Sequence, residues 1–171
     1  MSSTPRSAAH RLERYAEQLE RALAWLIVGL MVAMVADVSW QVVSRFLLRA
    51  PSSFTEELAG FLLIWIGLLG AAYALRTRAH LGIDLLTERL TGAGKCAAAI
   101  LAHTLVLLFA FTVMVVGGLR LVQLAFQLNQ ISAAMGLRMG YVYLALPLAG
   151  LLMVVFSLES IVTVAARRAE R

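Results

Sequence analysis

An acid, an amide and an arginine recur at helical spacing in the first apolar stretch of the sequence. Asp37, Gln41 and Arg45 follow i, i+4 and i+8, so a helix would align them on one face. An ionisable residue inside a membrane is a functional-site candidate, because its burial is costly unless it is paired. If Arg21 marks the inner boundary, a rise of about 1.5 Å per residue places Asp37 near the outer edge of a core about 30 Å thick. That depth favours an acid near the outer interface that pairs with Arg45 or with a partner chain.

Histidines and one cysteine are the other residues whose side chains could bind a metal. His103 stands alone in the third apolar stretch, whereas His80 belongs to a connection. His80 and Asp84 are four residues apart, but two residues do not make a metal site. Cys96 is the only cysteine, so neither an intrachain disulfide nor a cysteine-based metal cluster can form. We therefore expect His103 to donate to a neighbouring helix, and we expect no metal and no cofactor.

A second polar face follows the third apolar stretch, where Arg120, Gln123, Gln127 and Gln130 share one side of a helix. This face predicts a helix that continues beyond the membrane and is wet or packed against protein. The sequence has no serine–histidine pair at credible depth, no metal-ligand spacing and no phosphate-binding glycine loop. So few internal polar groups make a poor pore, and we expect a protein that is not an enzyme.

The amino-acid composition indicates whether these residues belong to a soluble protein or to a membrane protein. Hydrophobic residues make up 61% of the 171 residues and charged residues 15%, whereas a soluble domain has about 45–50% and about 25%. A globule of this size could not hide so much apolar surface, so lipid is the expected solvent. The net charge is +5, and the basic residues lie mainly at the ends of the expected helices. This placement indicates that they set the membrane topology and contact anionic lipid headgroups, rather than bind nucleic acid.

Four apolar segments are long enough to cross a membrane, since a spanning helix needs roughly 20 residues. We predict an all-α membrane protein with a single domain over residues 1–171. Its expected spans cover approximately residues 22–48, 54–78, 95–130 and 139–165.

Lysine and arginine predict the orientation of these spans. If the N-terminus is inside, the inner segments hold eleven basic residues and the outer segments hold four, which are Arg45, Arg49, Arg120 and Arg138. Cytoplasmic loops carry an excess of Lys and Arg. The bias predicts that both termini are cytoplasmic.

The connections carry further helical signals. Residues 10–24 alternate apolar and charged residues at helical spacing, which predicts an amphipathic helix on the inner membrane surface or a solvated helical tail. Ser53 and Glu56 match a capping box, and Glu56 and Glu57 would lie at the positive end of the second helix dipole. The inner connection, residues 80–95, has the pattern of a short interfacial helix.

Small residues and one proline mark the packing of the spans. Gly60, Gly67, Ala71 and Ala74 lie on one face of the second helix, where small side chains allow a close approach to another helix. Pro147 should kink the fourth helix mildly by freeing the carbonyl of residue 143. The aromatic residues expected to pack or to lie at the membrane interfaces are Trp25, Trp40, Trp65, Tyr141 and Tyr143.

The order of motifs around the second span resembles one family. The sequence runs from Phe54-Thr55-Glu56-Glu57 to Trp65, then through a Gly-Ala-Ala run to Arg76, and then to His80 and Asp84. Together with Arg45-Phe46 and the Tyr-Leu-Ala-Leu-Pro run that ends at Pro147, this pattern resembles the small membrane subunit of tripartite ATP-independent periplasmic (TRAP) transporters. Phe54 stands where that family often has Trp, and Gly60 where an Arg is common.

The resemblance implies a role in transport. Such systems import organic acids with a sodium gradient and a periplasmic substrate-binding protein, while a large membrane subunit carries substrate and ions. The small subunit would pack beside the large subunit in the bacterial inner membrane and enlarge its fixed scaffold, without binding substrate. The residues expected at the subunit interface or in structural roles are Arg45, Glu56, Glu57, Gly60, Trp65, Gly67, Ala71, Arg76, His80 and Asp84, and the intramembrane polar residues are Asp37, His103 and Arg120.

Two alternatives are weighed against this reading. A small homodimeric exporter would need an acid at the membrane centre, and the estimated depth of Asp37 does not fit. A haem-bearing anchor subunit of a respiratory complex would need two histidines at facing depth, and only His103 is placed inside a span.

Overall fold

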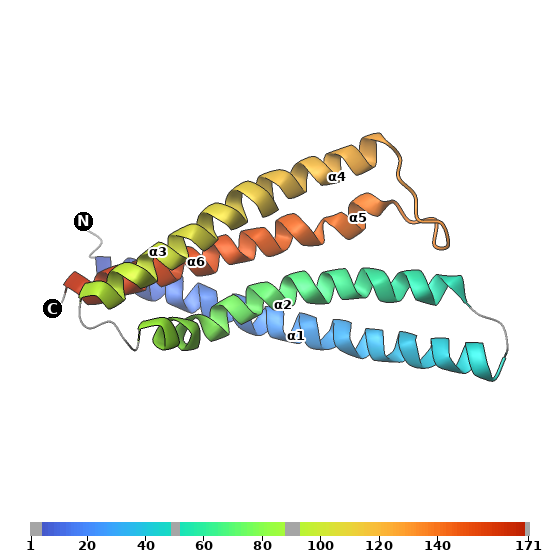
Figure 1. The fold of residues 1–171 in the computed structure, drawn as a ribbon, viewed down its shortest axis with the longest axis horizontal. Coiled ribbons are helices and arrows are strands. Elements are labelled where there is room, and N and C mark those ends of the chain that lie inside the picture. Colours follow the sequence, from blue (N-terminus) through green and yellow to red (C-terminus); the bar gives the residue numbers. More distant parts are fainter. Residues whose placement is uncertain (1–4, 49–51, 88–92, 170–171) are drawn as a thin grey trace.

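The protein forms two helical hairpins. The computed structural model describes residues 5–48, 52–87 and 93–169, and within them the side chains of residues 14–48, 52–77, 98 and 100–165. Figure 1 shows the hairpins converging at the end where both chain termini lie and diverging at the other end. The elements are α1 (Pro5–Phe46), α2 (Ser53–Thr87), α3 (Ala93–Phe109), a π-helix η1 (Ala110–Gly117), α4 (Gly118–Gln127), α5 (Met139–Tyr143) and α6 (Ala145–Ala169).

The described residues contain four helical stretches long and apolar enough to cross a membrane. The first two are Arg14–Phe46 in α1 and Ser53–Thr77 in α2. The third, Ile100–Gln127, runs through α3, η1 and α4, and the fourth, Met139–Ala165, through α5 and α6. The expected all-α membrane fold is confirmed.

Both segments that the sequence places on the inner side are helical and continuous with their spans. The amphipathic residues that precede the first span belong to α1, which is helical without interruption from Pro5. The helical residues of the inner connection up to Thr87 likewise extend α2. Residues 88–92 of the expected interfacial helix lie outside the described part of the chain.

The buried side of α1 repeats every seven residues, the spacing of two helices that wrap around each other. Helix α1 packs along α2, which runs antiparallel to it (Figure 1). The residues of the α1 seam are buried or half-buried and are Ala16, Leu23, Leu30, Asp37 and Ser44. A matching series on α2 consists of Thr55, Leu62, Leu69 and Arg76.

The second hairpin is packed through glycines. A Cβ atom on Gly150 would lie 2.7 Å from the Cβ of Met114, and one on Gly140 would lie 2.6 Å from the ring of Phe126. Real Cβ atoms do not come this close, so any larger residue at these two positions would force its neighbours to shift. Small residues let membrane helices approach closely where hydrophobicity gives no driving force between them.

Two backbone irregularities lie side by side in this hairpin. The fourth span is interrupted at Leu144, between α5 and α6. Pro147 accounts for this break, since it has no N–H to bond the carbonyl four residues earlier. The opposite span leaves its π-helix at Gly117, and a Cβ on Gly118 would lie 3.0 Å from Cδ of Pro147. The proline ring therefore packs directly against the end of η1.

The main core lies where α1, α2, α6 and η1 meet. Four of its eight buried members are alanines, so the backbones can come close around a few larger side chains. The buried members are Ala16, Leu23, Leu69, Ala72, Ala110, Met114, Ala149 and Phe156.

Candidate functional site

Glu57, near the start of α2, binds a whole turn of the second hairpin. Its carboxylate accepts hydrogen bonds from the amide N–H groups of Ala133, Ala134 and Met135, each at 3.0 Å. The hydroxyl of Ser132 donates a further bond to the same carboxylate. Successive N–H groups in a turn form a concave anion site, and bonds to an ionised acceptor are stronger than neutral ones. We call this cluster the outer contact.

The turn that binds Glu57 is closed by its own backbone bonds. Ile131 and Arg138 form an antiparallel bridge, and the Gly136 N–H donates to the Ser132 carbonyl at 3.1 Å. Gly136 adopts a φ of 65°, a left-handed conformation that costs glycine little. These bonds hold the turn in a shape that presents three consecutive amides to the Glu57 carboxylate.

A second polar cluster, which we call the inner contact, joins three helices near the other end of α2. The guanidinium of Arg76 binds the Glu159 carboxylate of α6 through Nη1 at 2.7 Å, and its Nε lies 3.3 Å from a carboxylate oxygen of Glu20 in α1. The Arg76 side chain is 15% exposed and that of Glu159 only 6%. Removing one partner of a buried ion pair typically costs about 3–5 kcal/mol, because the other charge stays buried.

Arg45 and Glu56 close the outer end of the first hairpin. Their side chains meet at 2.6 Å and are each about half exposed, so the pair is worth about 0–1 kcal/mol. This differs from the expected capping box, in which Glu56 would bond backward to Ser53. Helix α2 begins at Ser53 itself, and the Glu56 carboxylate binds Arg45 of α1 instead.

Asp37 is not paired with Arg45, which binds Glu56. The Asp37 side chain belongs to the α1 seam and is 9% exposed, and its Oδ2 has no hydrogen-bond partner among the described residues. Gln41, one turn along, is half-buried, and its carbonyl accepts a bond from the Ser44 hydroxyl at 3.0 Å. The local pairing expected for Asp37 is therefore absent from the described part of the chain.

Other residues singled out in the sequence lie apart from these contacts. His103 is buried, Trp65 is half-buried beside the core, and Arg120 is exposed on α4. His80 and Asp84 belong to the helical backbone of α2, and their side chains lie outside the described residues. Among the described residues, no group of three or more His, Cys, Asp or Glu side chains could hold a metal ion.

The small-residue face of α2 remains open. Gly60, Gly67 and Ala71 are exposed, and a Cβ on either glycine would meet nothing within 4 Å. The close helix approach that these residues predict is not made within the described part of this chain.

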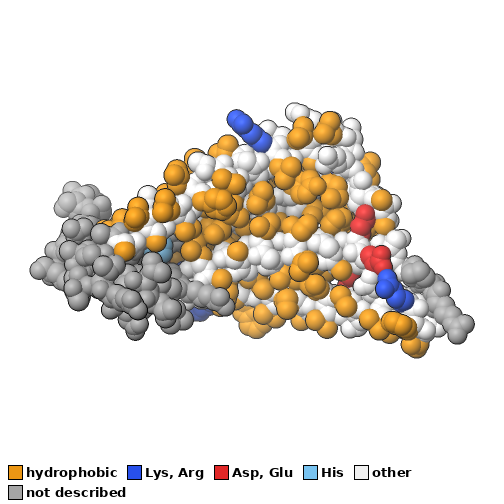
Figure 2. Space-filling model, in the orientation of Figure 1, with side chains coloured by type: hydrophobic (Ala, Val, Ile, Leu, Met, Phe, Trp, Pro, Cys, Tyr) orange, Lys and Arg blue, Asp and Glu red, His pale blue; other side chains and the backbone are white. Residues whose placement is uncertain are grey.

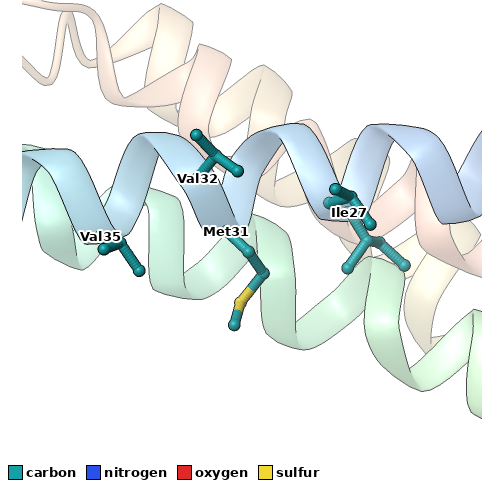
Figure 3. A pocket seen from close by; sticks show the side chains of 5 residues that line it. Ile27, Met31, Val32 and Val35 are labelled. Atoms are coloured by element: carbon teal, nitrogen blue, oxygen red, sulfur yellow. The ribbon is translucent and has the colours of Figure 1, made fainter.

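Much of the remaining surface is apolar. Figure 2 shows hydrophobic side chains along the length of one face, with acidic side chains gathered at the end away from the termini. A shallow groove on α1 is lined by Ile27, Val28, Met31, Val32 and Val35 (Figure 3). Its lining offers no polar side chain to orient a ligand, so the groove suits lipid or another helix.

Sequence reasoning named Glu57 and Arg76 but missed their partners Ser132, Glu20 and Glu159. The partners Ser132 and Glu159 are 75 and 83 residues away along the chain, so local patterns could not connect them. One signal was available, since Glu159 is an acid inside the fourth apolar segment, where an acid needs a partner.

Four spans, apolar outer faces and charged groups that join helix to helix define a polytopic membrane subunit. A sequence profile for the DctQ component of tripartite ATP-independent periplasmic transporters matches residues 31–167, and the chain belongs to this family. It is thus a TRAP transporter small permease subunit and a multi-pass inner-membrane protein, and the family implies a large permease partner.

Individual relatives agree with this assignment. The chain is 29% identical over 141 residues to the sialic acid TRAP transporter small permease protein SiaQ of Vibrio cholerae, covering 80% of this chain and 77% of the relative. It is 27% identical over 134 residues to a putative TRAP transporter small permease protein of Haemophilus influenzae, covering 78% and 81%. A third match, 35% identical over 75 residues, is to the sialic acid TRAP transporter permease protein SiaT of Haemophilus influenzae, covering 44% of this chain and 12% of that protein.

Proposed function

We propose that this chain is a scaffold that packs against and stabilises the large TRAP membrane subunit and does not itself bind substrate. The observation that carries the proposal is that charged groups of this chain bind other parts of the same chain. Arg76 and Glu159 bind each other across α2 and α6, and Glu57 binds a turn of its own chain. Groups committed to internal contacts serve rigidity, since a substrate site needs polar groups that a ligand can reach.

The match to SiaT supports a large permease as the partner. A stretch similar to this chain makes up 12% of a protein whose name is that of a permease. We infer that a small subunit such as this chain and a large permease subunit work in physical contact.

The open face of α2 is the proposed contact with the large subunit. Gly60, Gly67 and Ala71 leave room for a neighbouring backbone, and van der Waals packing at small residues is a principal force between membrane helices. We propose structural roles for three further residues of the α1–α2 pair, which are Arg45, Glu56 and Trp65. We propose the same for His80 and Asp84, in the part of α2 that follows its apolar stretch.

The transported substrate is proposed to be an organic acid, taken up with sodium and delivered by a periplasmic binding protein. Two relatives carry sialic acid in their names, and sialic acid is a carboxylic acid. These properties would belong to the whole transporter, and the present chain would contribute its fixed framework.

Both termini are proposed to be cytoplasmic. Figure 1 places them at the same end of the molecule, as four spans require, and the excess of Lys and Arg at that end selects the side. Reporter fusions after Arg168 should read cytoplasmic and fusions within residues 133–138 periplasmic. The opposite readings would contradict the proposed orientation.

Co-purification tests the scaffold role. When the chain is expressed with the large membrane subunit and extracted in mild detergent, we expect both to elute together from a sizing column. Elution of this chain alone or as a homodimer, under conditions where the large subunit stays intact, would overturn the proposal.

A further inference from the structure

Asp37 is the one acidic residue of the α1 seam. The seam positions that precede it along α1 hold alanine or leucine. Asp37 follows Ala16, Leu23 and Leu30 at intervals of seven residues, and its side chain is buried like theirs. The carboxyl oxygen Oδ2 is shielded and has no hydrogen-bond partner among the described residues. An intramembrane acid of this kind needs either a counter-ion or a proton.

Among the described residues, the charged groups that bracket Asp37 along the α1–α2 pair are committed elsewhere. On its own helix, Arg45 binds Glu56 at the outer end and Glu20 lies beside Arg76 at the inner end. These two pairs lie on either side of the seam section that contains Asp37.

The neighbouring helices offer no cation at the depth of Asp37. The stretch of α2 between the two pairs, residues 58–75, contains no charged residue. Glu57 of α2 is bound by the turn at residues 132–135, and Glu159 of α6 is bound by Arg76. Asp37 therefore faces a charge-free section of the seam, with acids and committed arginines beyond it.

We propose that Asp37 is a proton-binding site and is held as a neutral carboxylic acid within the α1–α2 seam. A neutral acid carries no charge that lipid or the seam must solvate, and its O–H can donate to a nearby backbone carbonyl, as hydroxyls do elsewhere in α1. Ser39 gives the example, since its hydroxyl donates to the carbonyl of Val35 at 2.7 Å. The inference goes beyond the scaffold role and does not depend on it.

The composition of the chain makes this site directly observable. Asp37 and Asp84 are the only aspartates in the sequence, so the signal that disappears in Asp37→Asn is that of Asp37. The full-length wild-type chain would be synthesised with carboxyl-¹³C aspartate, placed in lipid nanodiscs and measured by NMR at neutral and mildly alkaline pH. We expect the Asp37 signal to have the chemical shift of a carboxylic acid under both conditions. A carboxylate shift at neutral pH would overturn the proposal.

Two further measurements distinguish a protonated Asp37 from an ionised Asp37 that pairs with a cation of the large subunit. Adding unlabelled large subunit should leave the signal of the acid in place, and conversion to a carboxylate would show that the partner supplies a positive charge instead. Asp37→Asn replaces a neutral acid by a neutral amide, so the yield of complex should stay within about twofold of wild type. A loss of about tenfold or more would indicate an ionised, paired aspartate and contradict the proposal.

Discussion

Two consecutive glutamates show how differently one residue type is used in this protein. The carboxylate of Glu56 lies at the surface and binds Arg45, while that of Glu57 receives four donors from a turn of the other hairpin. Exposed ion pairs contribute little, whereas hydrogen bonds to a charged group contribute about 1.5–3 kcal/mol. Glu57 is therefore the residue that holds the outer ends of the two hairpins together.

Replacing Glu57 by glutamine tests this assignment. The side-chain amide turns one acceptor into a donor that faces backbone N–H groups, and the negative charge is lost. We expect Glu57→Gln to weaken these bonds and to speed hydrogen exchange of the amides of residues 133–135 by about tenfold or more. Glu56→Gln, one residue earlier, is the matched control and should leave that exchange unchanged. Equal protection in both variants would show that Glu57 does not hold the turn.

The sequence could identify Glu57 and Arg76 but not the groups that bind them. Arg76 and Glu57 were recognisable from their order in the family pattern and their place at the ends of a span. Their partners come from α6 and from the turn after α4, so the pairing exists only once the hairpins are assembled. Asp37 shows the converse, because the plausible local partner Arg45 is taken by Glu56 from the opposing helix.

At the scale of elements, the glycines fall into two groups that sequence alone did not separate. Gly140 and Gly150 lie where helices of the second hairpin touch, while Gly60 and Gly67 face open space on α2. Helical periodicity placed Gly60 and Gly67 on a common face, but it could not say whether that face packs inside the chain or outside it. The answer depends on where α1 and α6 lie around α2.

A pair of leucine substitutions separates the two roles. Gly150→Leu would drive a side chain into Met114 and should destabilise the folded chain by about 1–3 kcal/mol or more. A Cβ atom on Gly67 would meet nothing within 4 Å, so we expect the thermal unfolding of Gly67→Leu in detergent to match wild type, while its yield of complex with the large subunit should fall. An intact complex with Gly67→Leu would place the partner on another face.

The irregular elements show a further limit of sequence reasoning. Pro147 predicts an interruption of the fourth span, and the structure has one at Leu144. The π-helix at residues 110–117 has no comparable sequence signal. Its C-terminal end packs against Pro147 through Gly118, so the two irregularities are matched in space rather than in sequence.

At the scale of the whole molecule, α2 is joined to the second hairpin at both ends of its apolar stretch, Ser53–Thr77. The outer contact binds it to the turn after α4, the inner contact binds it to α6 and α1, and an apolar core lies between them. This arrangement resists a relative movement of the hairpins and leaves the faces of α1 and α2 exposed. Both properties suit a subunit that serves as fixed framework for a larger moving partner.

Uptake into liposomes tests the scaffold account most directly. Liposomes would contain this chain alone, or the chain with the large membrane subunit, and each would receive the binding protein loaded with its radiolabelled ligand under an inward sodium gradient. The account predicts accumulation only when the large subunit is present, because the buried charges of this chain are committed to holding its own helices together. Accumulation by liposomes that contain this chain alone would contradict it.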